Sequence, residues 1–549
     1  MEGYLIALAA ALAYAAVAWL GHVLGLWKRV GVSFYGPVLM WRTRRWGKGI
    51  ANAARHRMLW KRYGTMSSVL ASGLMLALVL ALLWVVYFAP DLPRAAAATA
   101  EIGPGLPTDD IMITLVYAVL GMVLAVIVHE LAHGVVTIAS GVRLDSMGVM
   151  FLVIPVGAFV EPNDEDLNKA GPEVRMRIFS SGLATNMVVA LACFALLAGV
   201  FVPSAEPVEA GALVTDATPG SPGQIWGLTA WTEVLAVGST NISSAADLMG
   251  ITFDQPGTPI GLELRYGNEH SQVVVPQGMV ITEVTDGPAM NAGLRQGMII
   301  RSINNTPIVS ADQLRSVIEN STRSAPVPIS VLEYGHDAAF PNGWFVENRS
   351  IAYINLTSKW LYYYTHFNWL NKEEYRNQSF MGVSTSPFGL KVTDPEHLLR
   401  LYGHPYAGAS GAEGVADATV RLLALPFIGY SPVLPPAADL YEPTGALSFL
   451  PNDVYWALVN LLYWVFWGNM MVGLANALPA LPLDGGNVFR DLLRWSVKLP
   501  RKGLLGLDRV THRRRLTDPG EDRLVRFLTL VVSAATLLLM AMLVLQPWY

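Results

Sequence analysis

The chain has 549 residues, of which 53% are hydrophobic and only 15% are charged, whereas soluble domains average about 25% charged residues. This composition excludes a disordered chain and a purely soluble protein, and a net charge of −4 offers no general field for nucleic acid. The single cysteine, Cys193, excludes a disulfide framework and a cysteine zinc cluster, so any metal must be held by histidine and carboxylate.

Six segments are long and apolar enough to cross a hydrocarbon core, which takes about 20 residues. They are 4–26, 67–89, 111–139, 178–201, 453–478 and 525–545. The first has no cleavage-site pattern and no basic residue before it, so we interpret it as a retained span and not as a signal peptide. The sequence therefore predicts a multi-pass α-helical membrane protein with about six transmembrane helices.

The loop between the first two spans sets the expected orientation. Residues 28–62 contain ten lysines and arginines and no acidic residue, which predicts a cytoplasmic loop. Alternating spans then place the N-terminus and residues 202–452 outside the cytoplasm, and residues 141–177 and 490–524 inside it. Every N-x-S/T sequon falls in the external segment, at Asn241, Asn304, Asn320, Asn348, Asn355 and Asn377.

The third span carries ionisable residues at its end. No charge occurs from Ile111 to Val128, and the sequence His129-Glu130-Leu-Ala-His133 follows. Charged groups inside a span are costly and usually functional. Because residues four apart share one face of a helix, both imidazoles can converge on one metal ion with Glu130 nearby, as in the H-E-x-x-H motif of zinc hydrolases. Hydrogen-bonded histidines within a helix bundle are the alternative interpretation.

Residues 148–162 follow the third span and are apolar, but they are too short and too broken to form another span. They are rich in β-branched residues, with Pro155 and Gly157 in the middle. We interpret them as a re-entrant β-hairpin.

The composition changes near Val202 to Gly, Pro, Thr and Ser with short alternating apolar runs, which predicts a β-rich soluble insert. From Gly278 to Asn320 the insert resembles a PDZ domain of the circularly permuted protease type, and a weaker copy begins near Gly211. Two PDZ-like modules are therefore expected in tandem. Such domains bind peptide ends by adding a strand to a sheet edge, while a simple spacer is the alternative.

The fifth span ends in Asn476-Ala-Leu-Pro479-Ala-Leu-Pro482-Leu-Asp484-Gly-Gly. Its two prolines must interrupt the helix, and irregular backbone at membrane depth is tolerated only inside protein or beside water. Catalytic zinc usually takes three protein ligands, and Asp484 is the one acidic residue between Asp453 and Asp491. Because spans three and five run in the same direction, Asp484 and the histidines are expected near the same membrane face.

At these residues the chain resembles the site-2 protease family of intramembrane zinc metalloproteases. The resemblance covers spans three to five and extends to the inserted PDZ-like modules. It implies that His129, His133 and Asp484 hold one Zn²⁺ and that Glu130 is the catalytic glutamate. It also implies hydrolysis of peptide bonds in single-pass membrane proteins, with the site near the cytoplasmic side of the cell membrane.

Two weaker features gain a meaning from the same resemblance. Gly182-Leu-Ala-Thr-Asn186 resembles the family's Gly-x-x-x-Asn motif, which implies that Asn186 and Asn476 place the scissile peptide or its oxyanion; interhelical hydrogen bonding is the alternative. The hairpin at 148–162 resembles the family's membrane-embedded β segment. In that case its residues Gly157, Ala158, Phe159 and Val160 pair with an unwound substrate strand, and a plain packing element is the alternative.

The expected partners are membrane-protein substrates, peptide ends and the lipid bilayer, with no nucleic acid. The predicted organisation of the chain has six parts. The parts are an N-terminal membrane region at 1–110, a catalytic core at 111–202, PDZ-like modules at 206–277 and 278–335, a connector at 336–450 with an apolar run at 422–433, and a last membrane region at 453–549.

Three other functions make different demands on the sequence. A metal-ion transporter predicts further ionisable residues along the spans, and almost none occur. An inactive scaffold has no use for Glu130. A membrane protease acting on prenylated or soluble tails would share the histidine pair, but it would not need the run from Asn476 to Asp484.

Overall fold

The computed structural model describes most of the chain. The described residues are 16–17, 19–21, 23–29, 32–35, 38–43, 47–88, 111–152, 154–321, 323–336, 344–366, 373–411, 414–415, 418–419, 433–504 and 519–545. Most of the predicted first span, 4–26, and nearly all of the apolar run at 422–433 lie outside them.

The chain divides into two compact units, which are described separately. The first comprises Met1–Thr99, Met112–Leu197 and Val459–Tyr549, and the second comprises Ala100–Ile111 and Ala198–Leu458. The second unit thus corresponds to the predicted external insert.

Five helices of the described residues are long and apolar enough to span a membrane, which fits a multi-pass membrane protein. They are α4 (Arg57–Phe88), α6 (Ile111–Ala139), α8 (Pro172–Leu196), α16 (Asn452–Ala477) and α18 (Pro519–Leu545). The second predicted span began at 67, but α4 begins at Arg57. The first two turns of α4 therefore carry basic residues. The long side chains of these residues can bury their stems and keep their charges in water.

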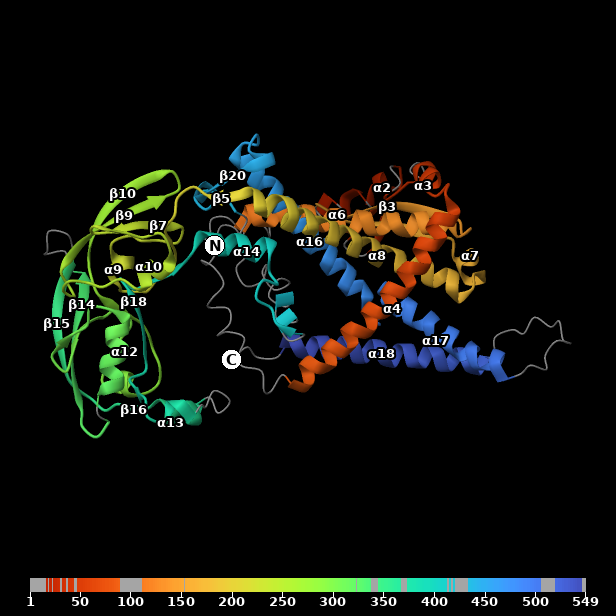
Figure 1. Ribbon diagram of the computed structural model, residues 1–549. Coiled ribbons are helices and arrows are strands. Elements are labelled where there is room, and N and C mark those ends of the chain that lie inside the picture. The colour runs from red at the N-terminus through yellow and green to blue at the C-terminus, as the bar shows by residue number, and fades with distance from the viewer. Residues whose placement is uncertain are drawn as a thin grey trace. The chain divides into compact units, whose positions relative to one another are not determined.

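Shorter helices complete the membrane unit. They are α2 (Leu26–Arg29), α3 (Gly47–Ala53), α7 (Asp164–Lys169) and α17 (Asp484–Leu504). Helix α17 packs against α8 and also contacts α18 (Figure 1). Helices α6 and α16 approach closely at Gly121 and Gly468, where a Cβ on Gly121 would lie 2.3 Å from the carbonyl oxygen of Trp464. Small residues permit this kind of contact between spans.

A four-stranded antiparallel sheet belongs to the same unit. Its strands are β1 (Val32–Tyr35), β2 (Val38–Thr43), β3 (Leu144–Leu152) and β4 (Ile154–Pro162), in the order β1-β2-β3-β4. The hairpin predicted at 148–162 is β3 and β4, and its first strand begins earlier, at Leu144. Strands β1 and β2 lie within the segment that was predicted only as a basic loop.

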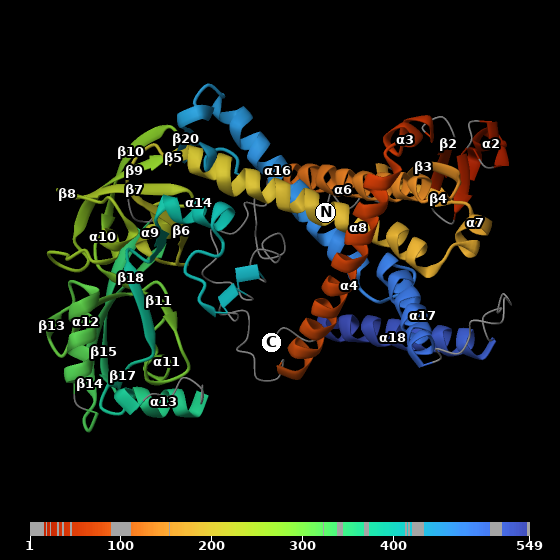
Figure 2. The ribbon, with the colours of Figure 1, turned by 45° about the vertical axis from the view of Figure 1, so that its right-hand side comes forward.

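The second unit contains two sheets with the same chain order of strands and helices. In the first, the elements are β6 (Ala212–Ala217), α9 (Pro222–Ile225), β7 (Thr232–Val237), β8 (Thr240–Asn241), α10 (Ala245–Met249), β9 (Pro259–Tyr266) and β10 (Glu269–Pro276). In the second, they are β11 (Met279–Val284), α11 (Pro288–Asn291), β12 (Ile299–Ile303), β13 (Thr306–Pro307), α12 (Ala311–Asn320), β14 (Val327–His336) and β15 (Trp344–Ile354). Figure 2 shows α12 beside β13 and β14.

Each sheet is completed by a strand that follows both repeats in the chain. Strand β18 (Val383–Pro387) pairs with β11, and β19 (Leu390–Thr393) pairs with β6. The side chain of Phe388, between them, is fully buried in a core shared by both sheets. The predicted module boundaries, 206–277 and 278–335, therefore leave out β19 of the first sheet and both β15 and β18 of the second.

The remaining elements of this unit surround the two sheets. They are η3 (Val202–Ser204), β5 (Ala205–Pro207), β16 (Thr357–Ser358), α13 (Lys359–His366), η5 (Glu373–Tyr375), β17 (Ser379–Phe380), α14 (Pro395–Gly403), η6 (Ala438–Leu440), β20 (Tyr441–Pro443) and η7 (Gly445–Leu447). Strand β5 pairs with β20, so the two ends of the insert meet in a small sheet.

Candidate metal centre

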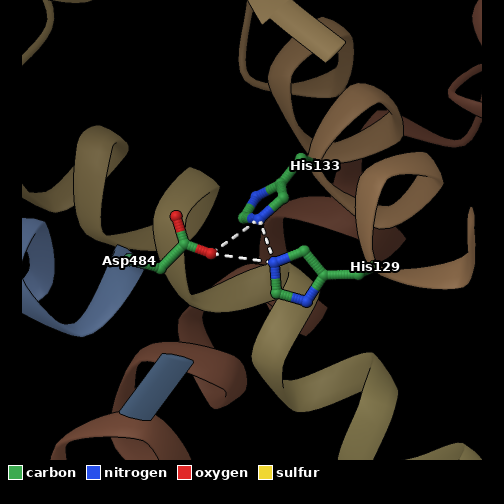
Figure 3. A group of neighbouring side chains, drawn as sticks. All are labelled: His129, His133 and Asp484. Atoms are coloured by element: carbon green, nitrogen blue, oxygen red, sulfur yellow. Dashed lines mark hydrogen bonds and ion pairs between the residues drawn. The ribbon is translucent and has the colours of Figure 1, made fainter. Parts of the chain in front are cut away.

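Three side chains from two distant parts of the chain meet in the membrane unit. His129 and His133 lie one turn apart on α6, and Asp484 is the first residue of α17. Figure 3 shows the three pointing toward one another. Their ligand atoms all lie within 4.8 Å of one another, and both histidines are buried, with 5% and 8% of their surface exposed.

The distances within this group are short and similar. The Nε2 atoms of the two histidines are 3.0 Å apart, and Oδ2 of Asp484 lies 3.0 Å from His129 Nε2 and 2.9 Å from His133 Nε2. Ligand atoms about 2 Å from one zinc ion in a tetrahedral arrangement are separated by about 3.3 Å. The triangle therefore has nearly the dimensions that a zinc site requires.

Hydrogen bonds on the far side of each ring determine which nitrogen carries the proton. His133 Nδ1 lies 2.7 Å from the carbonyl oxygen of Ile178, which can only accept. His129 Nδ1 lies 2.7 Å from Oδ1 of Asn186, whose amide nitrogen already donates to the carbonyl oxygen of Ala125. Both Nδ1 atoms are therefore donors, and in neutral rings both Nε2 atoms are left with lone pairs.

The lone pairs of two imidazoles and a carboxylate oxygen thus face one another in a buried place. Without a cation among them, this arrangement is repulsive, because like partial charges about 3 Å apart interact strongly in a low dielectric. Two neutral histidines and one carboxylate are also a ligand set that zinc commonly takes. The residues present fit a zinc ion on both grounds.

Asn186 contacts the Nδ1 edge of the His129 ring, which faces away from His133 and Asp484. It is completely buried, and its Nδ2 also donates to Oδ1 of Asn469 at 2.9 Å. Asn469 in turn donates to the carbonyl oxygen of Val465 within α16. This chain of amides fixes the His129 ring, as partners of ligating histidines generally do. Asn469 was not predicted to belong to the site, although an amide side chain inside an apolar span could have indicated it.

Asn476, the other asparagine expected near the reacting peptide, donates to the carbonyl oxygen of Val472 in its own helix at 3.0 Å. The expected roles of Asn186 and Asn476 at the scissile bond stay predictions.

Gly182 explains how α8 comes so close to α6. A Cβ at this position would lie 2.4 Å from His133 Nε2 and 2.7 Å from His129 Nε2, so any side chain would occupy the space between the rings and α8. Glycine is the one residue that allows this approach.

Glu130 reaches from the metal centre to the sheet. Its Oε2 accepts a hydrogen bond from the backbone N–H of Val160 at 2.9 Å. Val160 belongs to β4, which is an edge strand among the described residues, so the candidate general base lies directly beside this strand edge. The four residues predicted to pair with a substrate, Gly157 to Val160, all lie on this strand.

The irregular segment after α16 brings Asp484 into place. The chain leaves α16 at Ala477 and begins α17 at Asp484, and its prolines prevent the helix from continuing. Gly485 packs against the end of α16, where a Cβ would lie 2.3 Å from the carbonyl oxygen of Leu478. The glycine after Asp484 thus allows the close turn that directs the carboxylate toward α6.

Comparison with known proteins adds independent findings. The family model for peptidase family M50 matches residues 117–504. A protein of Clostridium perfringens named "Putative zinc metalloprotease CPE1693" is 26% identical over 180 residues, 28% of this chain and 52% of that protein. An uncharacterized protein of Methanocaldococcus jannaschii is 36% identical over 80 residues, 14% of this chain and 22% of that protein. The chain thus spans about half or less of the length of these relatives.

Proposed function

Because the chain belongs to peptidase family M50, the site-2 protease family, we propose that it is a zinc metalloprotease that hydrolyses peptide bonds within the transmembrane segments of other membrane proteins. The observation that carries this proposal is the buried triangle of His129, His133 and Asp484, with Glu130 beside it. Span-length helices around the triangle support a substrate that is itself in the membrane.

The three ligands would hold the metal, which when bound would supply Lewis-acid polarisation of the scissile carbonyl and make water more acidic. The Glu130 carboxylate accepts the proton of the attacking water and passes it to the leaving amine, as a general base and then a general acid. Asn186 and Ile178 orient the two imidazoles through their Nδ1 atoms, so that the rings need not reorganise during the reaction.

Strand β4 supplies the surface for the substrate. A transmembrane helix hides its carbonyl groups in internal hydrogen bonds, so it must unwind before attack. The N–H of Val160 points toward Glu130 and away from β3, and alternate residues of a strand direct their backbone groups to the same edge. Ala158 therefore offers its N–H and C=O groups to an added strand, and Val160, whose N–H donates to Glu130, offers its C=O. Such a strand would run past Glu130.

The external insert would select substrates. Its two similar sheets support the proposal of tandem PDZ-like modules, and β18 and β19 are edge strands on which a peptide end could add. We place this insert outside the cytoplasm and the metal centre near the cytoplasmic side, on the basis of the charges in the loops.

Cleavage of a reconstituted transmembrane peptide tests the proposal. Wild-type protein should cleave it, lose activity with a chelator, and recover with added zinc. Glu130→Gln should reduce turnover by about 10²-fold to 10⁴-fold, the usual contribution of general acid–base catalysis. Cleavage by Glu130→Gln at the wild-type rate would contradict the proposed role of this residue.

A further inference from the structure

A second polar site lies in the membrane unit, away from the metal ligands. A cavity of about 350 Å³ is bounded by α7, α8, α17 and α18, and four arginines line it: Arg175, Arg490, Arg494 and Arg526. Leucine and phenylalanine side chains form most of the remaining wall, and no carboxylate is among the described residues that line it. We call this cavity the arginine pocket.

One carboxylate holds two of these arginines in place. Asp491, which is fully buried, lies 2.6 Å from Arg175 and 3.4 Å from Arg494. The half-buried Arg490 has no hydrogen-bond partner for its Nε among the described residues, and a buried donor without a partner is costly.

The surroundings of Arg490 act on its charge. Burial lowers the pKa of Arg490, Asp491 opposes this effect, and Arg494, Arg175 and Arg526 lower the pKa further. An anion in the pocket would therefore favour the charged form of Arg490.

The position along the helices indicates the depth of the pocket. Arg175 lies three residues after the start of the span-length segment Pro172–Ser204, and Arg526 lies three residues after the start of Arg523–Ala541. The pocket is therefore expected at a membrane boundary and not at the bilayer centre. The loop charges predict that this is the cytoplasmic boundary, where anionic lipid head groups are concentrated.

We propose that the arginine pocket binds a phosphate group at the membrane surface, carried by a phospholipid head group or by a soluble phosphate. Guanidinium groups suit this ligand because their planar donors match phosphate oxygens in pairs. The volume is within the range of small-ligand sites, which begins at about 300 Å³. This proposal is independent of the proteolytic activity.

Native mass spectrometry of the full-length chain in detergent tests the proposal with three probes: phosphatidylglycerol, phosphatidylcholine and inorganic phosphate. The double variant Arg490→Gln/Arg526→Gln should bind the occupying anion about tenfold more weakly, which corresponds to about 1.4 kcal/mol. Arg62→Gln, at an exposed arginine of α4, is the matched control and should bind as wild type. Arginine-dependent binding of phosphatidylglycerol alone identifies a lipid, and equal binding of inorganic phosphate identifies a soluble ligand.

Two results would overturn the proposal: equal binding of every probe by wild type and the double variant, or arginine-dependent binding of an acidic peptide when neither phosphate nor phosphatidylglycerol binds. The thermal unfolding midpoint checks that the double variant is folded. Should it be unfolded, the single variant Arg526→Gln replaces it, because Arg526 is exposed at the pocket and its removal leaves the buried pair of Arg175 and Asp491 intact.

Discussion

Gly182 does more than allow two helices to approach each other. The two imidazoles lie where a side chain at position 182 would be. The amide of Asn186, one turn further along α8, holds the ring of His129 from the other side. Helix α8 therefore determines the position of both histidines without itself providing a ligand.

This view predicts the effect of Gly182→Ala. The added methyl group must push the imidazoles or α8 aside, so zinc affinity should fall by about 10-fold to 100-fold, as when other supporting groups of metal sites are changed. Competition with a chelator of known affinity measures the change. Gly199→Ala is the control, since a Cβ at Gly199 meets nothing within 4 Å. Equal zinc affinity in both variants would show that the close approach at Gly182 is unimportant.

The gathering of the two histidines and Asp484 could be anticipated at the residue scale because spacing and charge in apolar spans are strong signals. The support that Asn469 gives to His129 through Asn186 could not be anticipated, since many asparagines in spans serve only helix packing. Which face of α16 meets α6 depends on contacts such as that of Gly121 with Gly468, which no local pattern reveals.

At the scale of elements, β4 connects the sheet with the candidate base. The sequence predicted the hairpin of β3 and β4 from its broken apolar run. It did not predict that β1 and β2 extend the sheet on the side of β3 and leave β4 as the free edge. Strand β2 pairs with β3, which follows it by about a hundred residues, and such pairing is set by tertiary packing. In addition, the basic residues around β1 and β2 favour a loop when the sequence is read alone.

Ala158→Pro tests the free edge of β4. Proline removes the N–H that faces away from β3, and it is tolerated where an edge strand directs that group outward. Cleavage of a helical transmembrane substrate should fall by about tenfold, equivalent to about 1.4 kcal/mol, while zinc content stays at the wild-type value. Val32→Pro, at the first residue of β1 on the opposite edge, is the control. Unchanged cleavage by Ala158→Pro would mean that substrate does not pair with β4.

A buried ion pair joins two strands of the first sheet of the second unit. Glu233 on β7 and Arg265 on β9 are 0% and 2% exposed, with 3.3 Å between Oε2 and Nη1. Burial raises the pKa of Glu233 to about 7, although Arg265 opposes this effect. The folded state thus binds a proton more tightly than the unfolded state.

The sign of the pH dependence follows. Stability gained by protonating Glu233 is present below pH 4.5 and is lost as the pH rises toward about 7. The free energy of unfolding should fall over this window by on the order of 1 kcal/mol per pH unit. Hydrogen exchange of β7 and β9 in the full-length protein, corrected for intrinsic exchange rates, measures it. Glu233→Gln should remove the dependence, and a slope that persists in this variant would have another origin.

At the scale of the whole molecule, the two sheets of the second unit are interlocked through the segment that carries β18 and β19. The repeated motifs predicted two modules, but not that the chain returns to complete both of them. A strand added from a later segment has no local signature, so the predicted boundaries stopped at 335.

The interlocked arrangement changes how the insert should be removed. Deleting 206–335 would leave β18 and β19 without their partner strands and should cause aggregation. Replacing 208–440 with a short linker keeps the pairing of β5 with β20. This variant should still cleave a minimal transmembrane peptide, but its choice among substrates with external domains should change. Loss of cleavage of the minimal peptide by a folded variant would show that the insert takes part in hydrolysis.

The central claim is that Asp484 and two histidines hold one zinc ion for a reaction that needs Glu130. Zinc content of purified wild type, Asp484→Asn and Glu130→Gln, measured by plasma mass spectrometry, tests it most directly. We predict one zinc per chain in wild type and in Glu130→Gln, and about a tenth or less in Asp484→Asn, since a neutral amide is a poor zinc ligand. Full zinc content in Asp484→Asn, or its loss in Glu130→Gln, would contradict this assignment.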